Sequence, residues 1–65
     1  MIEQITNLAN SKRFKNLRKG QALMNALFII DRDLYNKITG TDADPFYVDE
    51  KINKFWEEIE RNNHG

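Results

Sequence analysis

The stretch Gln21–Ile30, QALMNALFII, constrains the fold more than any other part of the chain. Eight of its ten residues are apolar. On a helix with 3.6 residues per turn, these side chains point in nearly every direction, which is typical of a segment enclosed by other elements. The rest of the chain is more polar and offers no second stretch of this kind. We therefore expect the fold to be built around one central helix.

The length of the chain and its residue types exclude several classes of protein. A chain of 65 residues predicts a single domain over residues 1–65, and a domain of this size buries only about 60% of its unfolded surface. There is no cysteine, and the single histidine is His64, so we expect neither a metal nor a cofactor. No apolar run approaches the ~20 residues that span a bilayer, and the N-terminal residues lack a signal-peptide pattern. The expectation is a cytoplasmic protein without membrane association.

Apolar spacing predicts an all-α fold. Ile2, Ile5 and Leu8 form one stripe of a short helix over residues 2–9. A longer helix is expected from Lys12 to Ile30, with Gly20 inside it at a cost of roughly 1 kcal/mol relative to alanine. Either the helix begins near Gly20 or another backbone crosses closely there; we favour a continuous or slightly bent helix.

Two further helices are expected. Asp31 can cap a short helix over Arg32–Thr39, and Gly40 stands where helices commonly end in the left-handed conformation. A last amphipathic helix should cover Asp49–Arg61, followed by a frayed tail at residues 62–65. Its apolar side chains recur at i, i+3, i+4 and i+7: Ile52, Phe55, Trp56 and Ile59. The prediction is a small bundle of three main helices plus a short N-terminal helix.

The segment Gly40–Val48, GTDADPFYV, is expected to form a turn that folds back onto the central helix. Asp44 before Pro45 predicts a helix cap followed by the first helical residue. The spacing of Asp42 and Asp44 matches the first two ligands of a calcium loop, but the later ligands and the glycine are missing. We interpret these carboxylates as caps and turn formers. With no catalytic set of residues either, we expect a non-enzymatic protein.

A basic cluster is the first candidate binding surface. If Ser11 capped the long helix, the first cations would oppose the helix dipole, a cost that an anionic partner would explain. The alternative interpretation is the solvated face of an amphipathic helix, and no helix-turn-helix pattern accompanies it. The cluster comprises Lys12, Arg13, Lys15, Arg18 and Lys19.

An acidic and aromatic surface is the second candidate. Residues 1–32 carry six basic and two acidic side chains, whereas residues 33–65 carry four basic and eight acidic ones. Either the two halves attract each other across the fold, or one of them meets an external partner. Exposed aromatic side chains beside carboxylates would serve as protein-binding anchors. The candidate residues are Asp42, Asp44, Tyr47, Asp49, Glu50 and Trp56.

The chain resembles a family of short bacterial and phage or prophage proteins. The resemblance rests on a GQALMNAL helix, here Gly20–Leu27, a TDxDPFY turn, here Thr41–Tyr47, and a final aromatic-bearing helix, here Asp49–Trp56. It implies that the helix and the turn form one structural unit, which Gln21 and Asn25 would join by bonding the turn's backbone. The implied unit also contains Gly20, Asp44, Pro45, Phe46 and Tyr47.

These observations favour a small protein-interaction module that acts on a larger protein. The resemblance suggests a phage-encoded modulator or inhibitor of a host enzyme or of a defence or nuclease complex, acting in the host cytoplasm. The alternative is a nucleic-acid-binding protein that uses the basic cluster. Self-association is a further expectation, because so small a domain gains stability by sharing apolar surface.

Overall fold

The computed structural model describes residues 1–63, and these form an all-α fold, as the sequence predicts. Its α-helices are α1 (Ile2–Ala9), α2 (Lys19–Ile30), α3 (Arg32–Ile38) and α4 (Ile52–Asn63). One-turn 3-10 helices lie at Lys12–Phe14 and Asp49–Lys51. Helix α4 runs two residues beyond the expected Arg61, and the last two residues of the expected tail, 64 and 65, lie outside the described residues.

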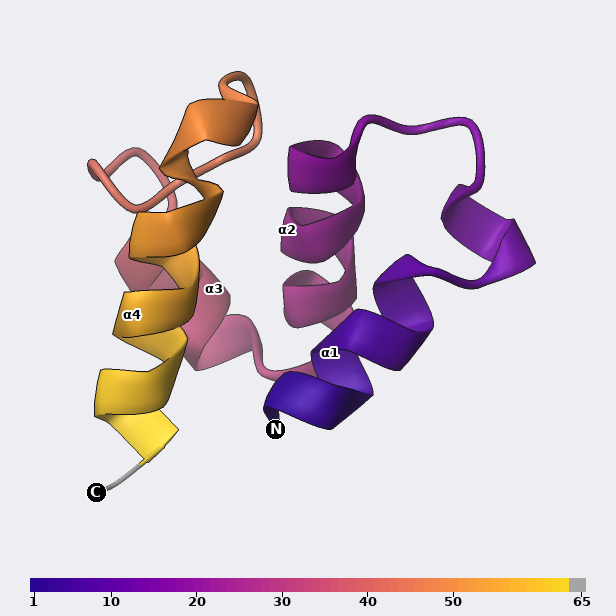
Figure 1. Cartoon of the computed structure of the whole chain (residues 1–65). Coiled ribbons are helices and arrows are strands. Elements are labelled where there is room, and N and C mark those ends of the chain that lie inside the picture. The colour runs from indigo at the N-terminus through magenta and orange to yellow at the C-terminus, as the bar shows by residue number, and fades with distance from the viewer. Residues whose placement is uncertain (64–65) are drawn as a thin grey trace.

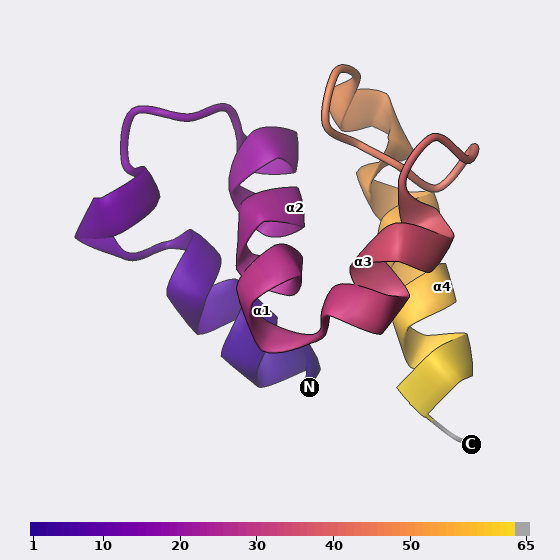
Figure 2. The same ribbon diagram turned by 180° about the vertical axis from the view of Figure 1, so that it is seen from behind.

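Helix α2 occupies the middle of the molecule (Figure 1). Helix α1 crosses α2 near the C-terminal end of α2. Helix α3 lies beside α4, as the view from behind shows (Figure 2). All four helices contribute to one core. The largest fully buried side chains of the described chain are Ile5, Met24, Leu27, Ile38, Pro45, Phe55 and Ile59.

The central stretch is enclosed along only part of its length. Leu23, Met24 and Leu27 are at most 2% exposed, as expected, but Phe28 and Ile29 at the end of α2 are 40% and 48% exposed. Phe28 forms an edge-to-face pair with the Tyr35 ring, with centroids 5.0 Å apart, and the guanidinium of Arg32 lies over its ring. The apolar composition of the stretch therefore overstates its burial at this end.

The continuous helix expected from Lys12 to Ile30 is wrong, because α2 begins only at Lys19. Arg18 has an extended backbone, with φ −64° and ψ 158°. A helix through this segment would bring Lys15 next to Lys12, Arg18 and Lys19 at spacings of three and four residues, and like charges at these spacings destabilise helices. Both explanations offered for Gly20 hold, since α2 starts beside it and another backbone crosses it.

The backbone that crosses at Gly20 belongs to the Pro45 turn. A Cβ added to Gly20 would lie 2.0 Å from the carbonyl oxygen of Pro45 and 2.8 Å from Oδ1 of Asp49. The backbone N–H of Gly20 donates to the same Oδ1 of Asp49, at 3.1 Å. A glycine is therefore required here for close approach rather than for its φ angle.

Arg18 fastens this turn to the start of α2. Its Nη2 and Nη1 donate to the carbonyl oxygens of Phe46 and Tyr47 at 2.5 and 3.1 Å, and Nη1 lies 3.9 Å from Asp49 Oδ1. The expectation that Gln21 and Asn25 join the helix to the turn is therefore corrected. Gln21 Oε1 instead accepts from the backbone N–H of Arg18 at 3.3 Å.

The expected Asp31 cap and the left-handed Gly40 are confirmed, whereas the helix caps expected at Asp44 and Ser11 are wrong. Asp31 caps α3 by accepting from Leu34 N at 3.1 Å, and Gly40 has φ +81°. Asp44 caps no helix: its carboxylate accepts from Gly40 N at 2.8 Å and Phe46 N at 2.9 Å, and this tightens the turn that buries Pro45. Ser11 likewise caps no helix, because its hydroxyl donates to Leu8 O at 2.7 Å at the end of α1.

Candidate binding groove with a basic rim

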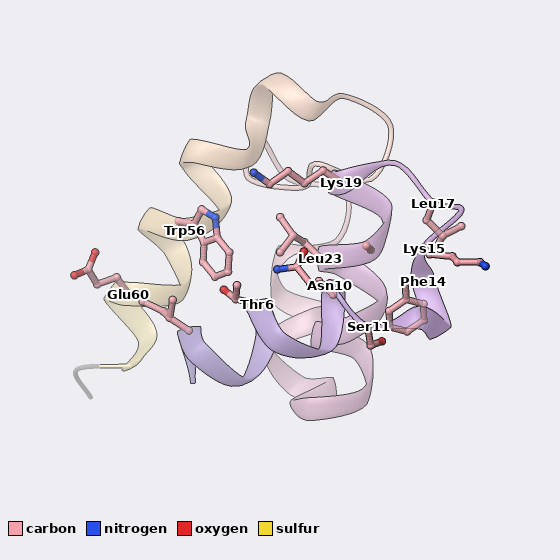
Figure 3. Close-up of a pocket in the computed structure, with 13 residues that line it drawn as sticks. Thr6, Asn10, Ser11, Phe14, Lys15, Leu17, Lys19, Leu23, Trp56 and Glu60 are labelled. Atoms are coloured by element: carbon pink, nitrogen blue, oxygen red, sulfur yellow. The ribbon is translucent and has the colours of Figure 1, made fainter.

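A groove of about 730 Å³ lies between α1, residues 12–18, the start of α2 and α4 (Figure 3). Its size falls within the range of about 300–1,000 Å³ that is typical of ligand sites. Its apolar lining consists of Ile2, Ala9, Phe14, Leu17, Ala22, Leu23 and Trp56. Its polar lining consists of Thr6, Asn10, Ser11, Lys15, Lys19 and Glu60.

The groove exists because small residues stand where the helices meet. Ala9 at the end of α1 and Ala22 on α2 are buried but fill little volume. Leu23, which is 2% exposed, and Ala22, which is 5% exposed, form the apolar lining on the α2 side. The segment 15–18 leaves the helical path between α1 and α2, so Leu17 remains 38% exposed at the margin. The result is an apolar surface that this chain leaves uncovered.

Trp56 and Phe14 come to the groove from opposite sides. In Figure 3 the indole of Trp56 points from α4 towards Thr6 and Leu23, whereas Phe14 lies beyond Asn10 and Ser11. The Trp56 ring packs edge-on against Phe55, with centroids 5.0 Å apart and an angle of 69°, and Phe55 is fully buried. The core therefore holds Trp56 in place while part of its ring remains accessible.

The rim of the groove is positively charged on the side of α2. Lys19 extends across the opening towards α4, and Lys15 points outward near Phe14 (Figure 3). Both lysines are exposed, and neither forms an ion pair within residues 1–63. The one lining carboxylate, Glu60, is at the far side on α4. A ligand with negative charge beside apolar groups complements this surface.

The five residues of the predicted basic cluster do not share one surface. Arg18 donates to the carbonyl oxygens of the Pro45 turn, as described above. Lys12 and Arg13 are exposed on the 3-10 helix but do not line the groove, and the Arg13 guanidinium lies 5.7 Å from the centre of the Phe14 ring. Because Lys12 and Arg13 do not begin α2, the supposed conflict with its dipole does not arise.

The predicted acidic surface does not form one patch. Asp44 and Asp49 are engaged by backbone N–H groups, as described above. Asp42 pairs with Lys54 and lies 3.9 Å from Lys51, and these cations, Lys54 first, hold the pKa of Asp42 below its usual range. Tyr47 and Glu50 are exposed, whereas Trp56 faces the groove instead.

Attraction between the two halves of the chain has little support from ion pairs. Of those formed among residues 1–63, Arg18–Asp49 alone joins the basic half to the acidic half. The sequence does not predict the groove, because the groove depends on how α1, α2 and α4 meet. Its signal in the sequence is weak: Leu17 and Phe14 among cations, and alanines at two helix contacts.

Within residues 1–63, no three Asp, Glu, His or Cys side chains are grouped so that they could hold a metal ion. None of the helices described has the length and apolar character needed to cross a membrane.

The comparisons with known proteins find no relative. No protein-family model, curated protein or solved structure matches the chain.

Proposed function

We propose that this protein is a small non-enzymatic interaction module whose groove binds a segment of a larger protein. The observation that carries the proposal is an uncovered apolar groove with Lys15 and Lys19 on its rim. Charge complementarity selects the occupant: a segment whose large apolar side chains enter the groove and whose carboxylates meet the lysines.

The lining favours a protein segment over a small metabolite. Small-molecule sites combine apolar walls with a few polar groups placed to fix orientation. None of the polar or charged side chains within residues 1–62 is buried, and the Ser11 hydroxyl is already bonded to Leu8 O. A surface without buried polar groups suits apolar side chains, and Trp56 is the type of residue that carries binding energy at protein interfaces. Following the resemblance seen in the sequence, the proposal extends to a host enzyme or nuclease complex as the larger protein.

A display library of random peptides tests this proposal. Peptides enriched on the immobilised protein should combine large apolar residues with Asp or Glu. Binding should weaken by about tenfold or more in the double variant Lys15→Glu/Lys19→Glu, because its rim repels carboxylates. Lys19→Glu also places an acidic residue in the first turn of α2, which favours the folded helix.

The double variant Lys12→Glu/Arg13→Glu is the matched control. It makes the same change in charge on the same segment but leaves the groove lining intact. Peptides that bind wild type and both double variants equally would refute the groove as the binding site, as would a selection that enriches no peptide.

Nucleic-acid binding is a second candidate, favoured by one observation. Lys12, Arg13, Lys15 and Lys19 are all exposed, and none forms an ion pair within the described part of the chain. Four phosphate contacts would make the logarithm of the affinity fall with the logarithm of salt concentration at a slope of about −3 to −4. Fluorescence anisotropy with labelled DNA and RNA measures this slope. In this case Lys12→Glu/Arg13→Glu should weaken binding as much as Lys15→Glu/Lys19→Glu, and absence of binding at low salt eliminates the candidate.

A further inference from the structure

We infer that the groove's partner is a second copy of this chain, which inserts the segment Tyr47–Glu50. This inference rests on the proposed function, because it uses the same groove and the same basic rim. It goes further by naming the segment that enters.

The segment Tyr47–Glu50, YVDE, has the chemistry that the groove requires. Tyr47 is 80% exposed and Val48 is 39% exposed. Of the two carboxylates that follow, Asp49 is held by Gly20 N–H and Arg18, whereas Glu50 is exposed and forms no ion pair among residues 1–63. An aromatic and a β-branched side chain beside the Glu50 carboxylate complement an apolar groove that has lysines on its rim. Tyrosine is also among the residues that most often supply binding energy at interfaces.

The segment is held in place before any partner arrives. Arg18 fixes the backbone by donating to the carbonyl oxygens of Phe46 and Tyr47. The Tyr47 ring also packs edge-on against Phe46, with centroids 4.9 Å apart and an angle of 70°. A preorganised segment loses little conformational entropy on binding, so more of its contact energy appears as affinity.

The other exposed apolar surfaces of the described chain do not fit. Ile2 and Leu17 already line the groove. Phe28 and Ile29 form a separate surface, but the Arg32 guanidinium lies 4.1 Å from the centre of the Phe28 ring. Its positive charge would meet the positive rim of the groove, and like charges brought together at an interface are costly. Beside Tyr47 the charge of Arg18 is met by Asp49, and Glu50 gives the segment a net negative charge, so charge favours Tyr47–Glu50.

The groove and the segment Tyr47–Glu50 both contact the stretch of chain at residues 17–19. Arg18 contacts the Tyr47 carbonyl, and its neighbours Leu17 and Lys19 line the groove. Tyr47 does not line the groove of its own chain. In a two-fold dimer each residue that contacts its partner is contacted in return, so two copies can each place Tyr47 in the other's groove.

Analytical ultracentrifugation of the whole chain tests this inference. The wild type should show a reversible monomer–dimer equilibrium at concentrations up to about 1 mM. The dimer should weaken between about 0.01 and 1 M salt, where the screening length falls from about 30 to about 3 Å. Tyr47→Ser and Lys15→Glu/Lys19→Glu should each weaken it by about tenfold or more. The controls Phe28→Ser and Lys12→Glu/Arg13→Glu should associate like the wild type.

Mixing the two defective variants makes the test specific. Lys15→Glu/Lys19→Glu retains Tyr47, and Tyr47→Ser retains the groove, so the mixture should form a heterodimer through one intact contact. Circular dichroism should give the same helix content for both variants, because the substituted side chains are exposed. A mixture that associates no better than its components overturns the inference.

The outcomes separate this inference from the proposed function. A chain that stays monomeric throughout, while library peptides bind its groove, overturns the second copy as partner and leaves the proposed function standing. A dimer lost in Phe28→Ser but not in Tyr47→Ser also overturns the inference, since it assigns self-association to the other apolar surface. Failure of both the peptide selection and dimerisation rejects both.

Discussion

Replacement of Gly20 by alanine tests the packing that organises this fold. Alanine normally stabilises a helix by about 1 kcal/mol relative to glycine. Here the new Cβ would lie 2.0 Å from the carbonyl oxygen of Pro45. This atom belongs to the backbone of a buried proline and cannot turn aside as a flexible side chain could, so the whole turn must shift.

The structure gives the size of the effect. Overpacking costs about 1–3 kcal/mol, and displacing Asp49 weakens a charge-assisted hydrogen bond from Gly20 N–H worth about 1 kcal/mol at this partly exposed site. After subtraction of the gain in helix propensity, the net loss is about 2 kcal/mol. A chain of this size has a total stability of about 3–10 kcal/mol. The expected fall in Tm is therefore about 8–16 °C.

Thermal unfolding followed by circular dichroism measures this change, and Gly40→Ala provides the comparison. Gly40 has φ +81° and no atom within 4 Å of an added Cβ, so alanine there costs only backbone strain, about 1–2 kcal/mol. Amide NMR spectra should show the Tyr47 signal shifting further in Gly20→Ala than in Gly40→Ala. A rise in Tm for Gly20→Ala would refute the close approach of Pro45, because propensity alone would then decide the outcome.

Three further predictions follow from single contacts. Leu27→Asp should abolish cooperative unfolding, because the side chain is fully buried and an unpaired buried carboxylate costs several kcal/mol; a native-like circular dichroism spectrum would contradict this. Arg18→Met should broaden or shift the amide signals of the Tyr47 turn, whereas Asn25→Leu should leave them unchanged; the reverse result would restore Asn25 as the link. Lys54 lowers the pKa of Asp42, and Asp42 raises the pKa of Lys54. Their pair therefore stabilises the fold between about pH 4 and pH 10.5, and loses this effect as pH falls through the pKa of Asp42 or rises through that of Lys54. In Lys54→Met, an NMR titration should return the Asp42 pKa towards its ordinary 3.8, and an unchanged value would exclude the pair.

Local chemistry explains why much of the fold could be predicted. The apolar spacing of Ile52, Phe55 and Ile59 predicts α4, and in the structure Phe55 and Ile59 are fully buried. The Asp31 cap and the left-handed Gly40 were predicted from neighbouring residues, because both depend on backbone groups within three or four positions.

The candidate groove could not be predicted in the same way. Lys15 and Lys19 were identified as cations, but their place on the rim of a groove depends on α1 and α4. The basic cluster predicts an anionic partner for Arg18, whereas its partners in the structure are carbonyl oxygens 28 and 29 residues away. Helical periodicity carries no information about such separations.

The sequence by itself determined that the chain is helical, where α1 and α3 lie, and which side chains are apolar enough to form the core. The tertiary structure decided which exposed groups remain available for binding. Gly20 shows the physical reason. The sequence shows that Gly20 has no side chain, but only the folded structure shows that the Pro45 backbone occupies that space. The same turn binds Arg18, whereas Lys19 lies at the edge of an open apolar groove.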